Sequence, residues 1–370
     1  MGVIAKIIVS GRKPEADEIK RVVVRGTNWV GDAVMTIPAL RQLRRVLPRA
    51  HITLATRSWA RGLFSGADFI DDLLVYDRRP RDFSAVVRQV KEWRRQRFDL
   101  ALIFQNAFEA AFVAAAARVP LRLGYATEGR RALLTHPLAV PTWKDKRHEI
   151  FYYLNLVGEL ERLLYGASSV ELQEPLFALA VSRERQAQAR SFLLAQGAGA
   201  GRPLVALCPG SINSRAKRWP ASRYAALADR LIEETGANVA LIGSREEEGV
   251  AAEVCAAMRH EPLRLAGRTD LAEAVAILSV ADLLVTNDTG PAHIAAALDC
   301  PTLVIFGPTD PATTRPFPSA GRIIRHPPDC APCMLRDCPI DHRCMTAIET
   351  EEVFAQAASM MRAHPAEVQT

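Results

Sequence analysis

The sequence has no long apolar run and no typical secretion signal. None of its hydrophobic stretches approaches the ~20 residues that a membrane-spanning helix needs, and its first twenty residues are too charged for a signal peptide. Seven cysteines, an odd number in a chain of 370 residues, do not suggest a disulfide framework. These absences predict a cytoplasmic protein.

Three common ligand-binding motifs are also missing. The chain contains neither G-x-G-x-x-G at the start of a helix nor G-x-x-x-x-G-K-[ST], which weakens the dinucleotide-binding and P-loop interpretations. It contains no D-x-D pair, so a divalent metal bridging a diphosphate is not indicated. Any phosphate site in this chain must then rely on cations and helix N-termini.

What is present is an alternating pattern of short apolar runs and helical segments in both halves of the chain. The composition, 49% hydrophobic and 24% charged, is that of a globular protein of about two domains. Continuously apolar strands between helices predict parallel sheets covered on both faces, hence an α/β, doubly wound fold in each half. The predicted strands are 21–25, 51–56, 72–77, 99–104, 203–208, 237–243, 262–267, 281–286 and 301–307.

The chain is expected to have four parts. Residues 1–20 are predicted to be an N-terminal extension, in which the apolar patch Val3 to Val9 is a candidate strand. Two Rossmann-like domains follow at 21–180 and 181–345, and a C-terminal helix in 346–370 should pack back across the domains.

The net charge of +6 is unevenly distributed, because residues 1–165 carry +11 and the remainder carries −5. A basic first half favours an acidic partner, such as nucleic acid, anionic lipid or an anionic glycan. The alternative is a solvated basic surface without a partner.

The first candidate turn, RGTNWVGDAVMTIPAL (residues 25–40), follows a predicted strand. Gly26 and Gly31 permit a tight turn. Asp32 is placed to cap the next helix, and the alternative is a carboxylate that acts on a ligand as a general base. Pro38 lies inside the helical pattern and should kink the helix or open its first turns.

The second candidate turn, LCPGSINSRAKRWP (residues 207–220), combines hydroxyl groups with cations after a predicted strand. This combination is suited to a phosphate, with Lys217 as the cation of a diphosphate site. The alternative is a solvated basic loop. The polar residues of the turn are Ser211, Asn213, Ser214, Arg215, Lys217 and Arg218.

A third turn carries Glu246, Glu247 and Glu248 after another strand. Acidic residues in a first helical turn stabilise the helix dipole. The alternative is that one of them holds the two hydroxyls of a ribose, as an acid after a strand does in dinucleotide-binding folds.

The fourth turn is VTNDTGPAHIAAAL (residues 285–298). Pro291 suits the first position of a helix, and the start of that helix favours an anion. Asp288 would repel a bare phosphate, so it either caps the helix or binds a neutral hydroxyl. His293 is either structural or faces the same ligand. Together, the four turns suggest a nucleotide-sugar donor in the second half and a base in the first.

Four cysteines near the end, Cys330, Cys333, Cys338 and Cys344, follow the spacing C-x2-C-x4-C-x5-C. They are candidates for a structural zinc or iron–sulfur site. The pattern lacks a second C-x-x-C, and the alternative is a proline-bent loop of half-buried thiols or a labile disulfide.

Three motifs, GTNWVGDAVMTIPAL, PGSINSRAKRWP and NDTGPAHIAAAL, resemble in order and spacing those of the family 9 glycosyltransferases, the heptosyltransferases of lipopolysaccharide core assembly. The resemblance covers roughly residues 21 to 355. The tail CAPCMLRDCPIDHRCM looks most like that of members that act on the first heptose of the inner core.

The resemblance implies a GT-B fold and an inverting, metal-independent transfer of L-glycero-D-manno-heptose from ADP-heptose, with no cofactor required. It implies that residues 21–180 bind the acceptor and 181–345 the ADP-sugar. Asp32 falls on the family's general base and Lys217 on its diphosphate lysine. The other residues that it places at the donor are Ser211, Asn213, one of Glu246, Glu247 and Glu248, and Asp288, Thr289, Gly290 and His293.

The resemblance also implies partners. The acceptor would be heptosyl-Kdo2-lipid A, met at the anionic cytoplasmic face of the inner membrane by a peripheral, monomeric protein that does not bind nucleic acid. The arginines expected to face this acceptor are Arg57, Arg61, Arg78, Arg79, Arg130 and Arg131. Two alternatives stay open: another GT-B enzyme of nucleotide sugars, and a non-catalytic module that binds a glycan or nucleic acid.

Overall fold

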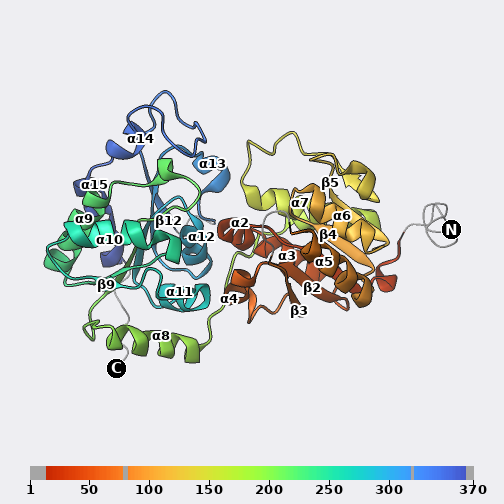
Figure 1. Ribbon diagram of the computed structural model, residues 1–370, viewed down its shortest axis with the longest axis horizontal. Coiled ribbons are helices and arrows are strands. Elements are labelled where there is room, and N and C mark those ends of the chain that lie inside the picture. Colours follow the sequence, from red (N-terminus) through yellow and green to blue (C-terminus); the bar gives the residue numbers. More distant parts are fainter. Residues whose placement is uncertain (1–13, 78–81, 318–320, 364–370) are drawn as a thin grey trace. The chain divides into compact units, whose positions relative to one another are not determined.

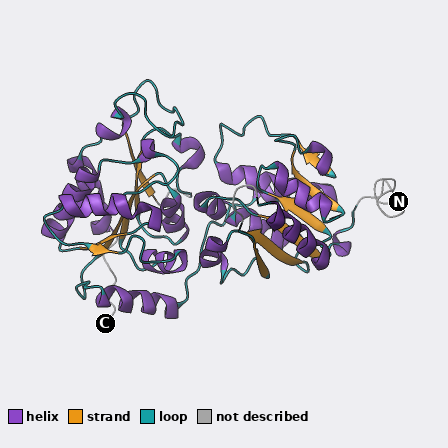
Figure 2. Cartoon of the chain, viewed as in Figure 1, coloured by secondary structure: helices purple, strands orange, loops and turns teal. Residues whose placement is uncertain are grey.

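The chain forms two compact units, and the division falls between Leu176 and Phe177. The predicted boundary lay four residues later, at 180. The computed structural model describes residues 14–77, 82–317 and 321–363. Figure 2 shows one sheet with helices on both of its faces in each unit.

The first unit contains a six-stranded sheet in the order β3-β2-β1-β4-β5-β6, with all neighbouring strands parallel. The four strands predicted in this half are confirmed. Two more were not predicted, because an arginine and a glycine interrupt the apolar run of β5, and β6 is a three-residue strand that contains a proline. The strands are β1 (Arg21–Arg25), β2 (His51–Thr56), β3 (Asp72–Val75), β4 (Leu100–Ile103), β5 (Leu121–Tyr125) and β6 (His136–Leu138).

The second unit repeats this topology. Its six parallel strands lie in the order β12-β11-β10-β7-β8-β9, so the strand order reverses between β7 and β10, as it does between β1 and β4. Such a reversal opens a crevice at the carboxyl ends of the two strands, where doubly wound folds bind ligands. The strands are β7 (Leu204–Cys208), β8 (Asn238–Leu241), β9 (Leu263–Arg264), β10 (Leu283–Asn287), β11 (Thr302–Phe306) and β12 (Gly321–Arg325).

Most of the helices lie between strands along the chain, and Figure 1 labels the α-helices. Those of the first unit are η1 (Ala16–Glu18), α2 (Val30–Met35), α3 (Ile37–Val46), η2 (Ser58–Ala60), α4 (Arg61–Phe64), α5 (Phe83–Gln96), α6 (Phe108–Ala116), η3 (Arg131–Leu133), α7 (Glu149–Tyr165) and η4 (Val170–Leu172). Those of the second are α8 (Arg183–Ala195), η5 (Arg215–Lys217), α9 (Ala221–Thr235), η6 (Arg245–Glu247), α10 (Glu248–Ala257), α11 (Leu271–Leu278), α12 (Gly290–Ala297), α13 (Pro311–Thr314), α14 (Arg343–Thr346) and α15 (Thr350–Ala363).

The helix after β1 is broken, as Pro38 predicts. α2 ends at Met35, and Thr36 separates it from α3, in which Pro38 occupies one of the first two positions. Proline has no N–H to donate to the preceding turn, so it is tolerated only where a helix starts. The break confines α2 to a short helix that carries Asp32 at the carboxyl end of β1.

The sequence predicted an N-terminal extension in residues 1–20 and a C-terminal helix in residues 346–370. The candidate strand Val3 to Val9 lies outside the described residues. The C-terminal helix α15 packs against α9 and β10 of the second unit, with Val353 and Ala357 fully buried. The Arg230 guanidinium lies 3.9 Å from the ring centre of Phe354 on this helix. Residues 364–370, the remainder of the predicted C-terminal part, are also outside the described residues.

A buried carboxylate on α7 supplies a stability test for the first unit. Glu161 is 7% exposed and accepts hydrogen bonds from the Ser168 hydroxyl (2.8 Å) and the Ser169 N–H (2.7 Å), and it pairs with Arg45 (2.9 Å). Burial opposes ionisation, but these partners outweigh it and lower the pKa of Glu161. We expect Glu161→Gln to lower the free energy of unfolding at neutral pH by about 1–3 kcal/mol, because a charged acceptor of several bonds is lost.

This difference should depend on pH. The folded-state pKa of Glu161 lies below its unfolded value, so its contribution is complete above the unfolded pKa and disappears as the pH falls through the folded one. Chemical denaturation at neutral and acidic pH measures this, with Glu159→Gln on the same helix as the control. An equal loss for the two variants, or one that grows in acid, would contradict the assignment.

Candidate functional site

The site of the second unit centres on Lys217 and Asp288, which meet where the strand order reverses. Lys217 Nζ donates to Asp288 Oδ2 at 2.9 Å and to the Asp288 backbone carbonyl at 3.1 Å. The Thr309 hydroxyl donates to the same Oδ2 at 2.7 Å, and Asp288 is only 3% exposed. The sequence predicted Lys217 and Asp288 separately. Thr309 was not predicted. The only indication of its role in the sequence is that it is a polar residue three positions after a strand.

Asn287, at the end of β10, holds the turns of this site together. Its side-chain NH₂ donates to the carbonyls of Pro209 (2.9 Å) and Gly210 (3.2 Å). Its side-chain oxygen accepts from the Trp219 N–H and from the Tyr224 hydroxyl, both at 3.1 Å. Asn287 is fully buried, so every one of these bonds replaces a bond to water. No role was predicted for Asn287 from the sequence, although it lies inside the fourth turn.

The polar residues of the Lys217 turn differ in their placement. Ser211 is buried, and its backbone carbonyl accepts from the Arg218 guanidinium at 2.9 Å. Asn213 is exposed. The hydroxyl of Ser214 donates to the carbonyls of Leu335 and Arg336 instead, at 3.2 and 3.3 Å. Ser214 thus bonds to the tail of the chain, and the roles predicted for Lys217, Ser211 and Asn213 at a ligand stay predictions.

The α12 terminus clarifies the role of Asp288. The helix begins at Gly290, with Thr289 as its N-cap residue and Pro291 at one of its first two positions. Asp288 does not cap it, because its carboxylate is engaged by Lys217 and Thr309. His293 is buried on the first turn of the helix. A helix N-terminus next to a lysine is a suitable environment for an anion.

Of the three glutamates after β8, the structure distinguishes Glu247. Its carboxylate accepts from the Ser244 N–H at 2.9 Å and lies directly over Gly210, where a β-carbon would overlap it. Glu246 is exposed, and Glu248 lies over Gly267. Glu247 is thus the acid beside the Lys217 turn, and the lack of a side chain at Gly210 makes room for it.

In the first unit, Asp32 is on the first turn of α2 but is not its cap, because the N-cap residue is Trp29. The buried phenol of Tyr153 lies within the electrostatic influence of Asp32. Burial, and then the negative charge of Asp32, raise the pKa of Tyr153 well above its usual value. Tyr153 therefore remains a neutral hydroxyl within the electrostatic influence of this carboxylate, and Asp32 does not occupy the N-cap position.

The placement of Arg130 does not fit its predicted role at an anionic acceptor. It is fully buried, and its guanidinium donates to the carbonyls of Tyr125 (2.8 Å) and Gln105 and to the Asn106 side chain (2.7 Å). Burial lowers the pKa of Arg130. A guanidinium so engaged holds the loops after β4 and β5 together. The sequence could not reveal this, because Arg130 and Arg131 are adjacent arginines and their types do not show which side chain is buried and which is exposed.

The remaining predicted acceptor arginines are nearer the surface. Arg61 on α4 and Arg131 in η3 are exposed, and Arg57 is half-buried with its guanidinium 5.3 Å from the ring centre of Tyr76. Arg78 and Arg79 lie outside the described residues. No described helix is both long enough and apolar enough to span a membrane.

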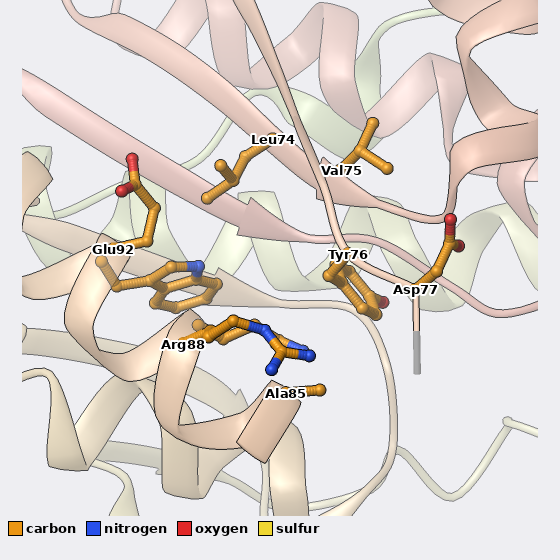
Figure 3. Close-up of a pocket in the computed structure, with 9 residues that line it drawn as sticks. Leu74, Val75, Tyr76, Asp77, Ala85, Arg88 and Glu92 are labelled. Carbon is orange, nitrogen blue, oxygen red and sulfur yellow. The ribbon is translucent and has the colours of Figure 1, made fainter. Parts of the chain in front are cut away.

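The first unit also has a cavity of about 320 Å³ at the end of β3, drawn in Figure 3, which the sequence did not predict. Tyr76 and Gln89 line it. Both contact Arg25, which is 2% exposed, donates to Gln89 Oε1 at 2.7 Å and stacks 3.5 Å from the ring centre of Tyr76. Part of the basic charge of the first half is thus buried and serves packing.

The cysteine run does not form the metal site that its spacing suggested. All four thiols are free; Cys330 is exposed and Cys344 is buried. Burial, and then the neighbouring thiols, raise the pKa of Cys344. Within residues 14–77, 82–317 and 321–363, no group of three or more His, Cys, Asp or Glu side chains is arranged to hold a metal ion.

Comparisons with known proteins agree with this architecture. The model of glycosyltransferase family 9 (heptosyltransferase) matches residues 86–343. Lipopolysaccharide heptosyltransferase 2 of Salmonella typhimurium is 32% identical over 323 residues, and lipooligosaccharide heptosyltransferase 2 of Haemophilus ducreyi is 31% identical over 317; each alignment covers 82% of this chain and 88% of the relative. The structure of E. coli ADP-heptose LPS heptosyltransferase II matches with a TM-score of 0.77 at 27% identity, covering 93% of this chain and 99% of that one. The predicted GT-B class is confirmed.

The bonds of Asn287 lead to a stability prediction. In Asn287→Asp, an oxygen replaces the NH₂ group and faces the two carbonyl oxygens of Pro209 and Gly210 without solvent. We expect the free energy of unfolding of the second unit to fall by about 3 kcal/mol, the cost of buried groups without partners. Chemical denaturation followed by circular dichroism measures it. Asn213→Asp, the same change at an exposed position, should be nearly neutral; a comparable loss there would contradict this explanation.

Proposed function

This chain belongs to glycosyltransferase family 9, and we propose that it transfers a heptose from ADP-heptose to the first heptose of a lipopolysaccharide inner core. The observation that carries the proposal is the Lys217–Asp288–Thr309 cluster at the strand reversal of the second unit. It supplies a cation and a helix N-terminus to a diphosphate in a chain whose relatives are named heptosyltransferases. The proposed reaction is inverting and needs no metal.

In the donor half, Lys217 and the start of α12 stabilise the negative charge of the departing ADP. Ser211, Asn213, Thr289 and Gly290 contact the phosphates, and Asp288 holds Lys217 in position. Glu247 accepts hydrogen bonds from the ribose hydroxyls, since one carboxylate oxygen suffices for the Ser244 N–H. His293 contributes by shaping the start of α12 from the interior.

In the acceptor half, Asp32 is the proposed general base. It removes the proton from an acceptor heptose hydroxyl, and that oxygen attacks the anomeric carbon of the donor. The bond from that carbon to the diphosphate breaks, and ADP leaves with the electron pair. Because its pKa is raised, the buried Tyr153 stays a neutral phenol and is a poor base, so the proton is accepted by the Asp32 carboxylate.

The acceptor, heptosyl-Kdo2-lipid A, carries carboxylates and phosphates. The exposed Arg61 and Arg131, with the half-buried Arg57, support an anionic acceptor and a peripheral location at the cytoplasmic face of the inner membrane. We propose that the protein acts there as a monomer without cofactor or nucleic acid.

The decisive experiment is incubation of the protein with ADP-heptose and defined truncated core acceptors, followed by mass spectrometry. A mass increase of one heptose on the heptosyl-Kdo2 acceptor supports the proposal. Transfer from UDP- or GDP-sugars instead would identify another donor, and binding of glycan without ADP release would indicate a non-catalytic module.

Asp32→Asn tests the base. The amide cannot accept the proton, so we expect the turnover rate to fall by about 10²–10⁴-fold. The affinity for ADP, measured by calorimetry, should stay within about twofold of the wild type, because Asp32 lies in the other unit from the diphosphate cluster. Near-normal turnover in the variant would refute the assignment.

Glu247→Gln and Glu246→Gln form a matched pair. Replacing the charged acceptor over Gly210 by a neutral one should weaken ADP binding about tenfold, as expected for a charge-assisted bond. The exposed Glu246 should be insensitive to the same change. Calorimetry with ADP provides the measurement. If Glu246→Gln weakens ADP binding more than Glu247→Gln does, Glu246 and not Glu247 binds the ribose.

A further inference from the structure

The cysteine segment, defined as residues 330–344, lies against the turn that carries Lys217. The Ala216 N–H donates to the Arg336 carbonyl at 2.9 Å. The Ala216 carbonyl accepts from His342 Nε2 at 2.6 Å, so this nitrogen carries the proton. Both backbone polar groups of the residue before Lys217 are therefore held by a part of the chain that is distant in sequence.

Two side-chain contacts extend this attachment. Ser214 donates to the Arg336 carbonyl at 3.3 Å, and Arg215 Nε pairs with Asp337 at 2.6 Å. The turn itself is a 3₁₀-helix of three residues, Arg215–Lys217, which is too short to be rigid alone. Its geometry therefore depends on contacts with other parts of the chain, among them Asn287, Asp288 and the cysteine segment.

The cysteine segment is itself anchored near the same site. The Met334 N–H donates to the carbonyl of Pro308 at 2.9 Å, and Pro308 precedes Thr309, which holds Asp288. Cys344 is buried at the other end, where a β-carbon on Gly307 would crowd its sulfur. The cysteine segment thus links the turn of Lys217 to the turn of Thr309.

We propose that the cysteine segment is a strap that positions Lys217 for the diphosphate of the donor, and that His342 is its main positioning residue. This inference rests on the proposed function, which supplies the diphosphate. His342 has a φ of 58°, in the left-handed region that residues other than glycine seldom adopt. In this backbone conformation the His342 ring reaches the Ala216 carbonyl and donates to it.

The test compares two ligands, ADP and adenosine, because only ADP presents a diphosphate to Lys217. His342→Ala should weaken ADP about tenfold, the effect of losing one buried hydrogen bond on the position of the lysine. Adenosine affinity should not change. His342→Gln, whose amide can donate to the same carbonyl, should restore most of the ADP affinity. The control is His326→Ala, an exposed histidine of the same unit that pairs with Glu352.

Calorimetry gives both affinities, and thermal unfolding verifies that each variant is folded. If His342→Ala does not fold, Asp337→Ala removes an exposed contact of the strap and should weaken ADP about threefold with adenosine unchanged. Unchanged ADP affinity, or an equal loss for ADP and adenosine, would overturn the strap. A wild-type protein that binds no ADP would overturn the proposed function and the strap with it.

Discussion

The site of the second unit depends on one buried amide, that of Asn287. Parallel strands bring the carboxyl ends of β7 and β10 together, but they do not determine the path of the loops beyond. Asn287 does so by donating to the loop after β7 and accepting from the residues that follow the Lys217 turn. No apolar residue can replace it, because its short side chain carries both a donor and an acceptor. By holding the loop that carries Lys217 next to the end of β10, Asn287 brings Lys217 to Asp288.

The first unit uses a buried arginine at the equivalent end of its first strand. Arg25 ends β1, donates to Gln105 and Gln89, and stacks on Tyr76. Arg130 performs a similar task for the loops after β4 and β5. Guanidinium groups suit this work because five donors in one plane satisfy several carbonyls at once. The positive charge of this half is therefore partly structural, and a count of charges overstates the surface offered to an anionic acceptor.

Most of the strands that could be predicted contain a run of three or more apolar residues. β1, β7 and β11 are almost wholly buried, so apolar residues occupy their central positions and leave a clear signal. β12 was missed because it lies at an edge of the sheet and its sequence, GRIIR, has only two apolar residues, flanked by arginines. The break before α3 was predictable, since proline acts through its own covalent structure and needs no tertiary context.

The sequence alone determined the architecture and the turns that could bind a phosphate, because periodicity, glycine and proline act locally along the chain. It also determined Lys217, Asp288 and Asp32 as candidates, because their types and positions after strands indicate their chemistry. Only the tertiary structure decided which of them pair, that Arg130 is internal, that Glu247 rather than Glu246 faces Gly210, and that the cysteines form no metal group among the described residues. Such outcomes depend on the direction of each side chain from its backbone and on contacts across many residues of sequence, neither of which is written in the local pattern.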